Sequence, residues 1–401
     1  MKSFGDRLDD ETREWVNQDV ITEEQRDEIL SRYEGEDRSR AVRVILILGA
    51  VMVGLGALLF VGANWSAIPV AGRMLLLVSL TTTAYYSGWN VKYKREGWNK
   101  VGDALLFIGS LSVGATLFLT AQTFNVEANV HWLLLLWLVA VAPASYAVDS
   151  KPTLLLSMVL LGWWSGSYVG GGSLFDVAEG FFTNIGAYAF YGLTLYGVGR
   201  LHEGTRFDGF ASTYKTFGPL FFFAMTYAVV VSELAAVWRV ESVEGSAFLF
   251  LMLFTAVATA GVNVYLGKID EKVEGVWYAG AFALSLFTVG VSWIFVNTEL
   301  VGETDRLVVN TLTVLYHAAF LALVVGVIYM GYEKRATAYV NIGLLFFVLY
   351  TGYLYVAKIA TYLGTSLAFV VGGLILLIGG TYLEKKRREM VKEMGGEPSW
   401  T

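Results

Sequence analysis

Long runs of apolar residues, separated by short polar connections, dominate the chain from residue 43 onward. A helix needs about twenty residues to cross about 30 Å of hydrocarbon, and most of the runs reach that length. Their hydrophobicity is continuous rather than alternating, which argues against a transmembrane β-barrel. The pattern predicts an all-α, polytopic membrane protein with twelve crossings, at 44–65, 70–90, 101–123, 131–148, 153–170, 180–199, 216–234, 247–266, 275–296, 307–330, 337–357 and 363–383.

Residues 1–40 have a different pattern, which is typical of a polar helical hairpin. Thr22 is predicted to N-cap the second helix, with Gln25 three positions later completing a capping box. A segment of this size is too small to hold a core alone, so we expect it to dock on the membrane domain or on a cytoplasmic protein. The predicted domains are a cytoplasmic hairpin at 1–40, a twelve-helix membrane domain at 41–384 and a basic tail at 385–401.

Lys and Arg indicate which connections face the cytoplasm, because cytoplasmic connections carry the excess of both. With the N-terminus inside, the inner segments hold twenty of these residues and the outer connections hold four, namely Arg73, Arg239, Arg306 and Lys358. An odd number of crossings would place the basic tail outside, against this bias. We therefore expect both termini in the cytoplasm.

Composition narrows the class of function. Hydrophobic residues make up 55% of the chain and charged residues 16%, which is too apolar for a soluble domain. Cysteine is absent, which excludes disulfides, thiolate metal sites and cysteine nucleophiles. Neither a phosphate-binding G-x-x-x-x-G-K-[ST] motif nor a G-x-S-x-G motif occurs, and the three histidines are predicted at three different membrane depths. We expect no cofactor, no metal and no nucleic-acid partner, and a membrane enzyme is the weakest hypothesis.

Several strings resemble a known family. The segments "ILGAVMVGLGALLFVGANWSAIPVAGRMLLL" and "GDALLFIGSLSVGATLFLTAQTFNVEANVHWLLLLWLVAVAPASYAV" resemble the prokaryotic predicted membrane proteins catalogued as domain of unknown function 2157. The N-terminal "EWVNQDVITEEQRDEILSRY" and the tail "TSLAFVVGGLILLIGGTYLEKKRRE" are similar to that family's ends. The resemblance implies a multi-pass protein of a prokaryotic plasma membrane with a small cytoplasmic N-terminal module. It implies no activity, so no functional residues are carried over.

Polar residues gather in two predicted outer connections. The connection at 120–132 is rich in amides and contains no Lys or Arg. Arg73 lies just inside the second crossing, where an unpaired guanidinium is costly, so Glu127 or a carbonyl is its expected partner. The set forms either an outer-mouth ligand or headgroup site, or a solvated surface from which Arg73 reaches the outer phosphates. Its members are Asn64, Trp65, Arg73, Gln122, Asn125, Glu127 and His131.

Two predicted crossings also carry polar faces within the membrane. His317 falls near the midplane, where its imidazole either relays protons or holds a substrate, or makes one hydrogen bond to a neighbouring helix. The two faces consist of Asn184, Tyr188 and Tyr191 on the sixth crossing, and Asn310, Thr313, Tyr316 and His317 on the tenth.

Glycines with helical spacing predict close helix packing, either within one protomer or at a homodimer seam. These glycines are Gly162, Gly166 and Gly170 on the fifth crossing, and Gly372, Gly373, Gly379 and Gly380 on the last. The oligomeric state cannot be chosen from the spacing alone.

Two function hypotheses remain open. The first is binding, or passive or weakly coupled movement, of a small solute or lipid along the polar faces. The second is a non-transporting membrane scaffold or sensor whose hairpin recruits a cytoplasmic partner. The polar faces and the number of crossings favour the first hypothesis. The predicted crossings carry no Asp or Glu at depth, which favours the second.

Overall fold

A computed structural model of the protein describes most of the chain, and all regular secondary structure in the described residues is helical, as the hydrophobic pattern predicts. The chain divides into two compact units, Met1–Leu76 and Leu77–Thr401, and the boundary falls within helix α3 (Val70–Lys94). The described residues are 4–18, 20–30, 52, 63–126, 129–169, 185–231, 243–269, 272–297, 303–359, 367, 370, 373, 374, 381, 384, 385 and 387–389.

The smaller unit contains helix α1 (Phe4–Asn17), a second helical segment at 23–30 and a short 3-10 helix, η1 (Trp65–Ala67). The backbone N–H of Gln25 donates to Thr22 Oγ1 at 3.2 Å, and the backbone N–H of Thr22 donates to Gln25 Oε1 at 3.0 Å. These two bonds confirm the capping box that the sequence predicts. The start of the second helical segment is therefore fixed by residues next to one another in the chain.

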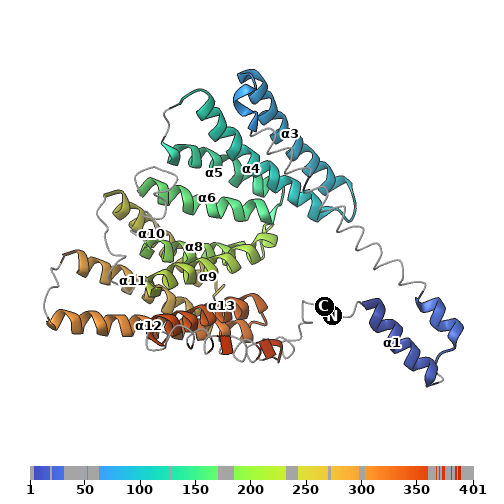
Figure 1. The fold of residues 1–401 in the computed structure, drawn as a ribbon. Coiled ribbons are helices and arrows are strands. Elements are labelled where there is room, and N and C mark those ends of the chain that lie inside the picture. The colour runs from blue at the N-terminus through green and yellow to red at the C-terminus, as the bar shows by residue number, and fades with distance from the viewer. Residues whose placement is uncertain are drawn as a thin grey trace. The chain divides into compact units, whose positions relative to one another are not determined.

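The larger unit is built from antiparallel helices (Figure 1). After α3, the helices are α4 (Asn99–Thr123), α5 (Val130–Ala147), α6 (Lys151–Val169), α8 (Ile185–His202), α9 (Asp208–Val231), α10 (Val243–Tyr265), α11 (Glu274–Asn297), α12 (Glu303–Glu333) and α13 (Thr337–Leu354), followed by a short π-helical stretch, η2 (Tyr355–Ile359). Short turns join α3 to α4, α5 to α6, α8 to α9 and α12 to α13.

Helix α8 is the interior helix of this unit. It packs against α9, α10 and α11, and thirteen of its eighteen residues are buried. Around it, α9 also contacts α12 and α13, while α4, α5 and α6 pack on one another and α6 reaches α9 and α10. The main apolar core therefore lies between α8 and the helices that surround it.

Seven of the described helical segments are long and apolar enough to cross a membrane. Each coincides with a crossing predicted from the sequence, and together they make the chain a polytopic α-helical membrane protein. The segments are Asn99–Thr123, Val130–Ala147, Asp208–Val231, Ala247–Tyr265, Glu274–Val291, Leu307–Glu333 and Thr337–Ala357.

Seven spans are fewer than the twelve crossings predicted. The predicted crossings at 70–90, 153–170 and 180–199 coincide with α3, α6 and α8, which are helical but are not among the seven. Hydroxyl-bearing and glycine residues lower the hydropathy of these helices, as in "LTTTAYYSG" of α3 and "GAYAFYGLTLYG" of α8. The predicted crossings at 44–65 and 363–383 lie largely outside the described residues.

Close backbone contact between α8 and α9 involves two glycines outside the predicted set. A Cβ on Gly192 of α8 would lie 2.8 Å from the Gly218 carbonyl oxygen of α9, and a Cβ on Gly218 would lie 2.7 Å from the Gly192 carbonyl oxygen. A Cβ on Gly162 would make only ordinary contacts with side chains of α8 and α9, and Gly166 is buried. A Cβ on Gly373 would meet nothing within 4 Å. Of the predicted set, Gly170, Gly372, Gly379 and Gly380 lie outside the described residues.

Replacing Gly192 with Ala should destabilise the larger unit, because the new methyl group would overlap the backbone of α9. Overpacking of this kind costs about 1–3 kcal/mol. The Gly261→Ala variant on α10 is a matched control, since nothing lies within 4 Å of a Cβ at that position. Thermal unfolding in detergent compares the two variants with the parent chain. Equal midpoints for both variants would contradict the close α8–α9 contact.

Candidate functional site

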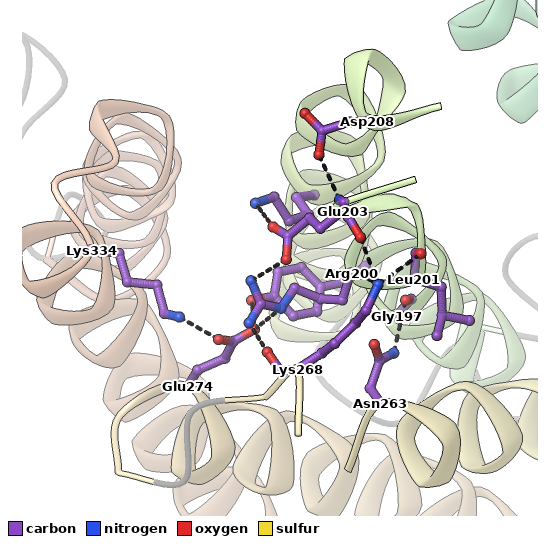
Figure 2. A network of polar contacts seen from close by, with 12 residues as sticks. Gly197, Arg200, Leu201, Glu203, Asp208, Asn263, Lys268, Glu274 and Lys334 are labelled. Carbon is purple, nitrogen blue, oxygen red and sulfur yellow. Dashed lines mark hydrogen bonds and ion pairs between the residues drawn. The ribbon is translucent and has the colours of Figure 1, made fainter. Parts of the chain in front are cut away.

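A chain of five alternating charges connects the ends of several helices (Figure 2). Arg200, in the last turn of α8, approaches Glu203 Oε2 at 2.6 Å through Nη1 and Glu274 Oε1 at 2.9 Å through Nε. Lys215 of α9 pairs with the other oxygen of Glu203, and Lys334, just after α12, pairs with the other oxygen of Glu274. These five residues are termed the ion-pair chain.

Glu274 is the most enclosed member of the ion-pair chain. It begins α11, has no exposed surface, and also accepts a hydrogen bond from the Tyr196 hydroxyl. Burial of a carboxylate is costly unless partners compensate for the lost water. Four features compensate for the water that Glu274 loses: the cations Arg200 and Lys334, the Tyr196 hydroxyl, and the positive end of the α11 dipole. Glu274 therefore links α8, α11 and the turn after α12.

Lys268, in the turn between α10 and α11, closes the C-terminal end of α8. Its ammonium donates to the carbonyl oxygens of Arg200, Leu201 and Glu203 at 3.1, 3.0 and 2.7 Å (Figure 2). Carbonyls at a helix C-terminus lack partners within the helix, and a cation there also interacts favourably with the helix dipole. The Arg200 guanidinium donates to the Lys268 carbonyl in return. The two turns are thus bonded in both directions.

Polar contacts connect all five turns that the distribution of Lys and Arg places on one side of the membrane. Lys92 donates to the carbonyls of Val148 and Asp149 at 2.9 and 2.6 Å, which joins α3 to the α5–α6 turn. The Tyr146 hydroxyl lies 3.0 Å from His202 Nε2, which joins α5 to the α8–α9 turn. The ion-pair chain joins the remaining turns. The described residues of these turns, 95–98, 148–150, 203–207, 266–269, 272–273 and 334–336, are together termed the basic end.

The described part of the C-terminal tail lies at the same end. Arg387 Nε donates to Asn341 Oδ1 at 2.7 Å, and Asn341 lies near the start of α13, directly after one of the turns of the basic end. Hydrogen bonding from Arg388, together with the charge of Arg387, lowers the pKa of Glu384. These contacts support the predicted alternation of the turns, and the leaflet that the basic end faces stays a prediction.

The residues predicted at an outer mouth are divided between the two units. In the smaller unit, Arg73 Nε donates to the Ile68 carbonyl at 2.9 Å, and its guanidinium lies over the Trp65 ring, 5.5 Å from the centroid. A carbonyl was one of the two partners expected for Arg73, and the ring adds a cation–π contact. Asn64 is exposed beside them.

In the larger unit, the outer-mouth residues lie at the connection between α4 and α5. Gln122 and Asn125 are exposed, and the ring of His131 lies edge-on to Tyr168 at the end of α6, with 5.5 Å between centroids. Glu127 lies outside the described residues. That these residues and those of the smaller unit form one mouth stays a prediction.

The described members of the two predicted polar faces contact different neighbouring helices. On α8, Tyr188 lies 3.1 Å from Ser165 Oγ of α6, and Tyr191 donates to the Met158 carbonyl of α6 at 2.8 Å. On α12, the Tyr316 hydroxyl lies 3.4 Å from the Thr226 carbonyl of α9. His317 Nδ1 lies 3.3 Å from the Tyr350 hydroxyl of α13, and the Thr313 hydroxyl donates to a carbonyl of its own helix. Asn310 is exposed, and Asn184 lies outside the described residues.

The sequence reasoning did not identify the ion-pair chain. It counted Lys and Arg on the predicted inner turns but did not match them with Glu203 and Glu274, which lie on the same turns. Glu274 directly precedes the predicted crossing at 275–296, so it falls outside the apolar segments. One sequence feature could have indicated the ion-pair chain. Glu274 is a carboxylate at the first position of an apolar helix, and other turns predicted on the same side of the membrane carry an excess of Lys and Arg.

Comparison with known proteins bears on the N-terminal part of the chain. Residues 13–154 match the family model described as "Predicted membrane protein (DUF2157)". This part of the chain belongs to the DUF2157 family. No curated protein and no solved structure matches the chain. The DUF2157 match ends in the first turn of α6, so the ion-pair chain lies beyond it. Within the described residues, no group of three or more His, Asp or Glu side chains could hold a metal ion.

Replacing Glu274 with Gln should destabilise the protein strongly, because Arg200 and Lys334 would lose the carboxylate between them. Removing one partner of a buried ion pair costs about 3–5 kcal/mol. The matched control is Glu333→Gln, an exposed carboxylate beside Lys334, with an expected change within about 0.5 kcal/mol.

Thermal unfolding in detergent measures the stability of both variants. The same measurement is made on Lys334→Gln alone and on the Glu274→Gln/Lys334→Gln double variant. We expect Lys334→Gln to have a smaller effect when Glu274 is already neutral, because the two side chains then have no ion pair to lose. Equal losses in both backgrounds would show that the pair does not couple the helices.

Proposed function

We propose that this multi-pass membrane protein is a non-transporting scaffold or sensor, whose helix bundle holds an acidic cytoplasmic hairpin that recruits a partner. The observation that supports this proposal most directly is that the tyrosines of the two predicted polar faces contact neighbouring helices. Tyr188, Tyr191 and Tyr316 are buried and each contacts a polar group on a neighbouring helix. Polar groups arranged in this way hold helices together rather than line a water-filled path.

The charge distribution supports a recruiting role for the hairpin. Residues 1–40 contain thirteen carboxylates and seven basic residues, a net charge of −6, which equals the net charge of the whole chain. The remaining residues are therefore balanced overall. On the hairpin, Val20 is exposed and Trp15 is 37% exposed. An acidic surface with exposed apolar side chains is complementary to a partner protein whose binding surface is basic and also carries apolar side chains.

Movement of a small solute or lipid remains the second candidate. Asn310 is exposed on α12 and Thr313 is only partly buried one turn further along the helix. These two residues favour a polar face that is open on one side. The buried tyrosines argue against extension of that face through the bundle.

We also propose that α3, α6, α8 and the segments at 44–65 and 363–383 cross the membrane, which gives twelve crossings with both termini in the cytoplasm. Helix α8 lies among three helices that each have the length and hydropathy of a span. Because α8 is enclosed by protein, its polar and glycine residues need not be stable in lipid. Low hydropathy in such a helix reflects burial rather than contact with water.

Cysteine accessibility distinguishes the two candidate functions in this naturally cysteine-free chain. Cysteines at Ser165, Thr226 and Thr288, all buried, should resist a charged, water-soluble thiol reagent, because such a reagent reaches only hydrated thiolates. A cysteine at the exposed Thr205 in the α8–α9 turn is the control and should react. Reaction of the buried positions at a rate close to that of the control would favour transport.

A photo-reactive residue at Trp15 should form one discrete cross-linked adduct in membranes of the native host, since Trp15 lies on the proposed recruiting surface. The same residue at Thr205 should not form this adduct. Exchanging Asp9, Asp10 and Glu14 for their amides should weaken the adduct, because the partner is expected to be basic. Identical adducts at both positions, or none at Trp15, would contradict recruitment through the hairpin.

A further inference from the structure

The ion-pair chain and Lys268 together carry more positive than negative charge. Four cations, Arg200, Lys215, Lys268 and Lys334, face two carboxylates, Glu203 and Glu274, so the cluster has an excess of two positive charges. Such an excess at the ends of membrane helices attracts anions.

The cluster lies at the level where headgroups are expected. Helix α8 ends at His202, α11 begins at Glu274 and α12 ends at Glu333, so three helices that line the core terminate beside these charges. Helices of this kind end where the hydrocarbon ends and the phosphate layer begins. Lys215 starts about two turns inside α9, and its side chain extends toward Glu203 at that level.

The members of the cluster differ in how much of their hydrogen-bonding capacity the protein uses. Lys268 donates to three carbonyls, and the side chain of Arg200, which is 14% exposed, lies between two carboxylates. Lys215 and Lys334 each pair with one carboxylate, and each side chain is 25% exposed. An ammonium has three donors. The two end lysines therefore retain donors and an accessible surface for a further acceptor.

We propose that Lys215 and Lys334 bind the headgroup phosphates of anionic phospholipids at the basic end. A phosphate diester offers the acceptor oxygens that the end lysines can use, and its negative charge offsets the excess of the cluster. Glu203 and Glu274 hold the two ammonium groups at the headgroup level, while Arg200 and Lys268 are engaged by the protein (Figure 2). This site is separate from the hairpin that is proposed to recruit a partner.

The test uses the full chain in lipid nanodiscs that contain equal total lipid and either phosphatidylcholine alone or a mixture with phosphatidylglycerol. Native mass spectrometry measures the preference for retained phosphatidylglycerol over phosphatidylcholine. Replacing Lys215 or Lys334 with Gln should lower this preference about five-fold per lysine, which corresponds to about 1 kcal/mol. Lys→Arg at the same positions should preserve it. Lys100→Gln, which removes an exposed lysine at the start of α4, is the control and should leave the preference unchanged.

Two further measurements keep the outcome independent of folding. Each variant is compared with its own stability in phosphatidylcholine, and the Glu274→Gln/Lys334→Gln variant removes both partners of that ion pair, while Arg200 keeps its pairing with Glu203. We expect phosphatidylglycerol to raise the thermal midpoint of the parent chain and to raise that of the paired variant less. Inorganic phosphate added to phosphatidylcholine nanodiscs should not reproduce the effect.

Stabilisation by inorganic phosphate equal to that by phosphatidylglycerol would overturn the lipid assignment in favour of a soluble anion. An equal loss of preference in Lys100→Gln would show that phosphatidylglycerol responds to overall surface charge, and would overturn the site itself.

Discussion

One buried carboxylate organises the larger unit of this membrane protein. Glu274 has no exposed surface and lies between Arg200 and Lys334, so it can keep its charge only while three helix ends remain together. The dependence is mutual, because each cation would also lose its counter-charge if the turns separated. A requirement of this kind sets the positions of α8, α11 and α12 more strictly than apolar packing, in which neighbouring lipid can replace a side chain at little cost.

The helices of the larger unit are held together by contacts between their backbones and polar side chains. The α8–α9 pair brings two backbones together at Gly192 and Gly218, and Tyr188 and Tyr191 of α8 contact polar groups of α6. Small residues permit close approach, and hydroxyls find acceptors on the helix that is closest. Polar residues in a transmembrane sequence are therefore as consistent with a packed interior as with a pathway, and their partners decide between the two.

Features that depend on residues close together in the chain were predictable from the sequence. Features that depend on contacts between distant residues were not. Thr22 and Gln25 form the expected cap because both partners lie within one helical turn. Seven crossings coincide with long apolar runs because hydropathy is a sum over neighbours in the chain. Glu274 was missed because its partners lie 74 and 60 residues away. Gly192 was missed because its partner is on another helix, where spacing along one helix carries no information.

The tight α8–α9 contact has a consequence for the biogenesis of this protein. Helix α8 alone is not among the segments apolar enough to enter a bilayer, whereas α9 is, and only five residues separate them. With their backbones in contact through glycines, the two helices can leave the translocation machinery as one antiparallel pair. In that pair α9 supplies the hydrophobicity and shields one side of α8 from lipid. With the proposed crossing of α8, the order of synthesis matters, since α8 must wait for its successor before it can leave an aqueous channel.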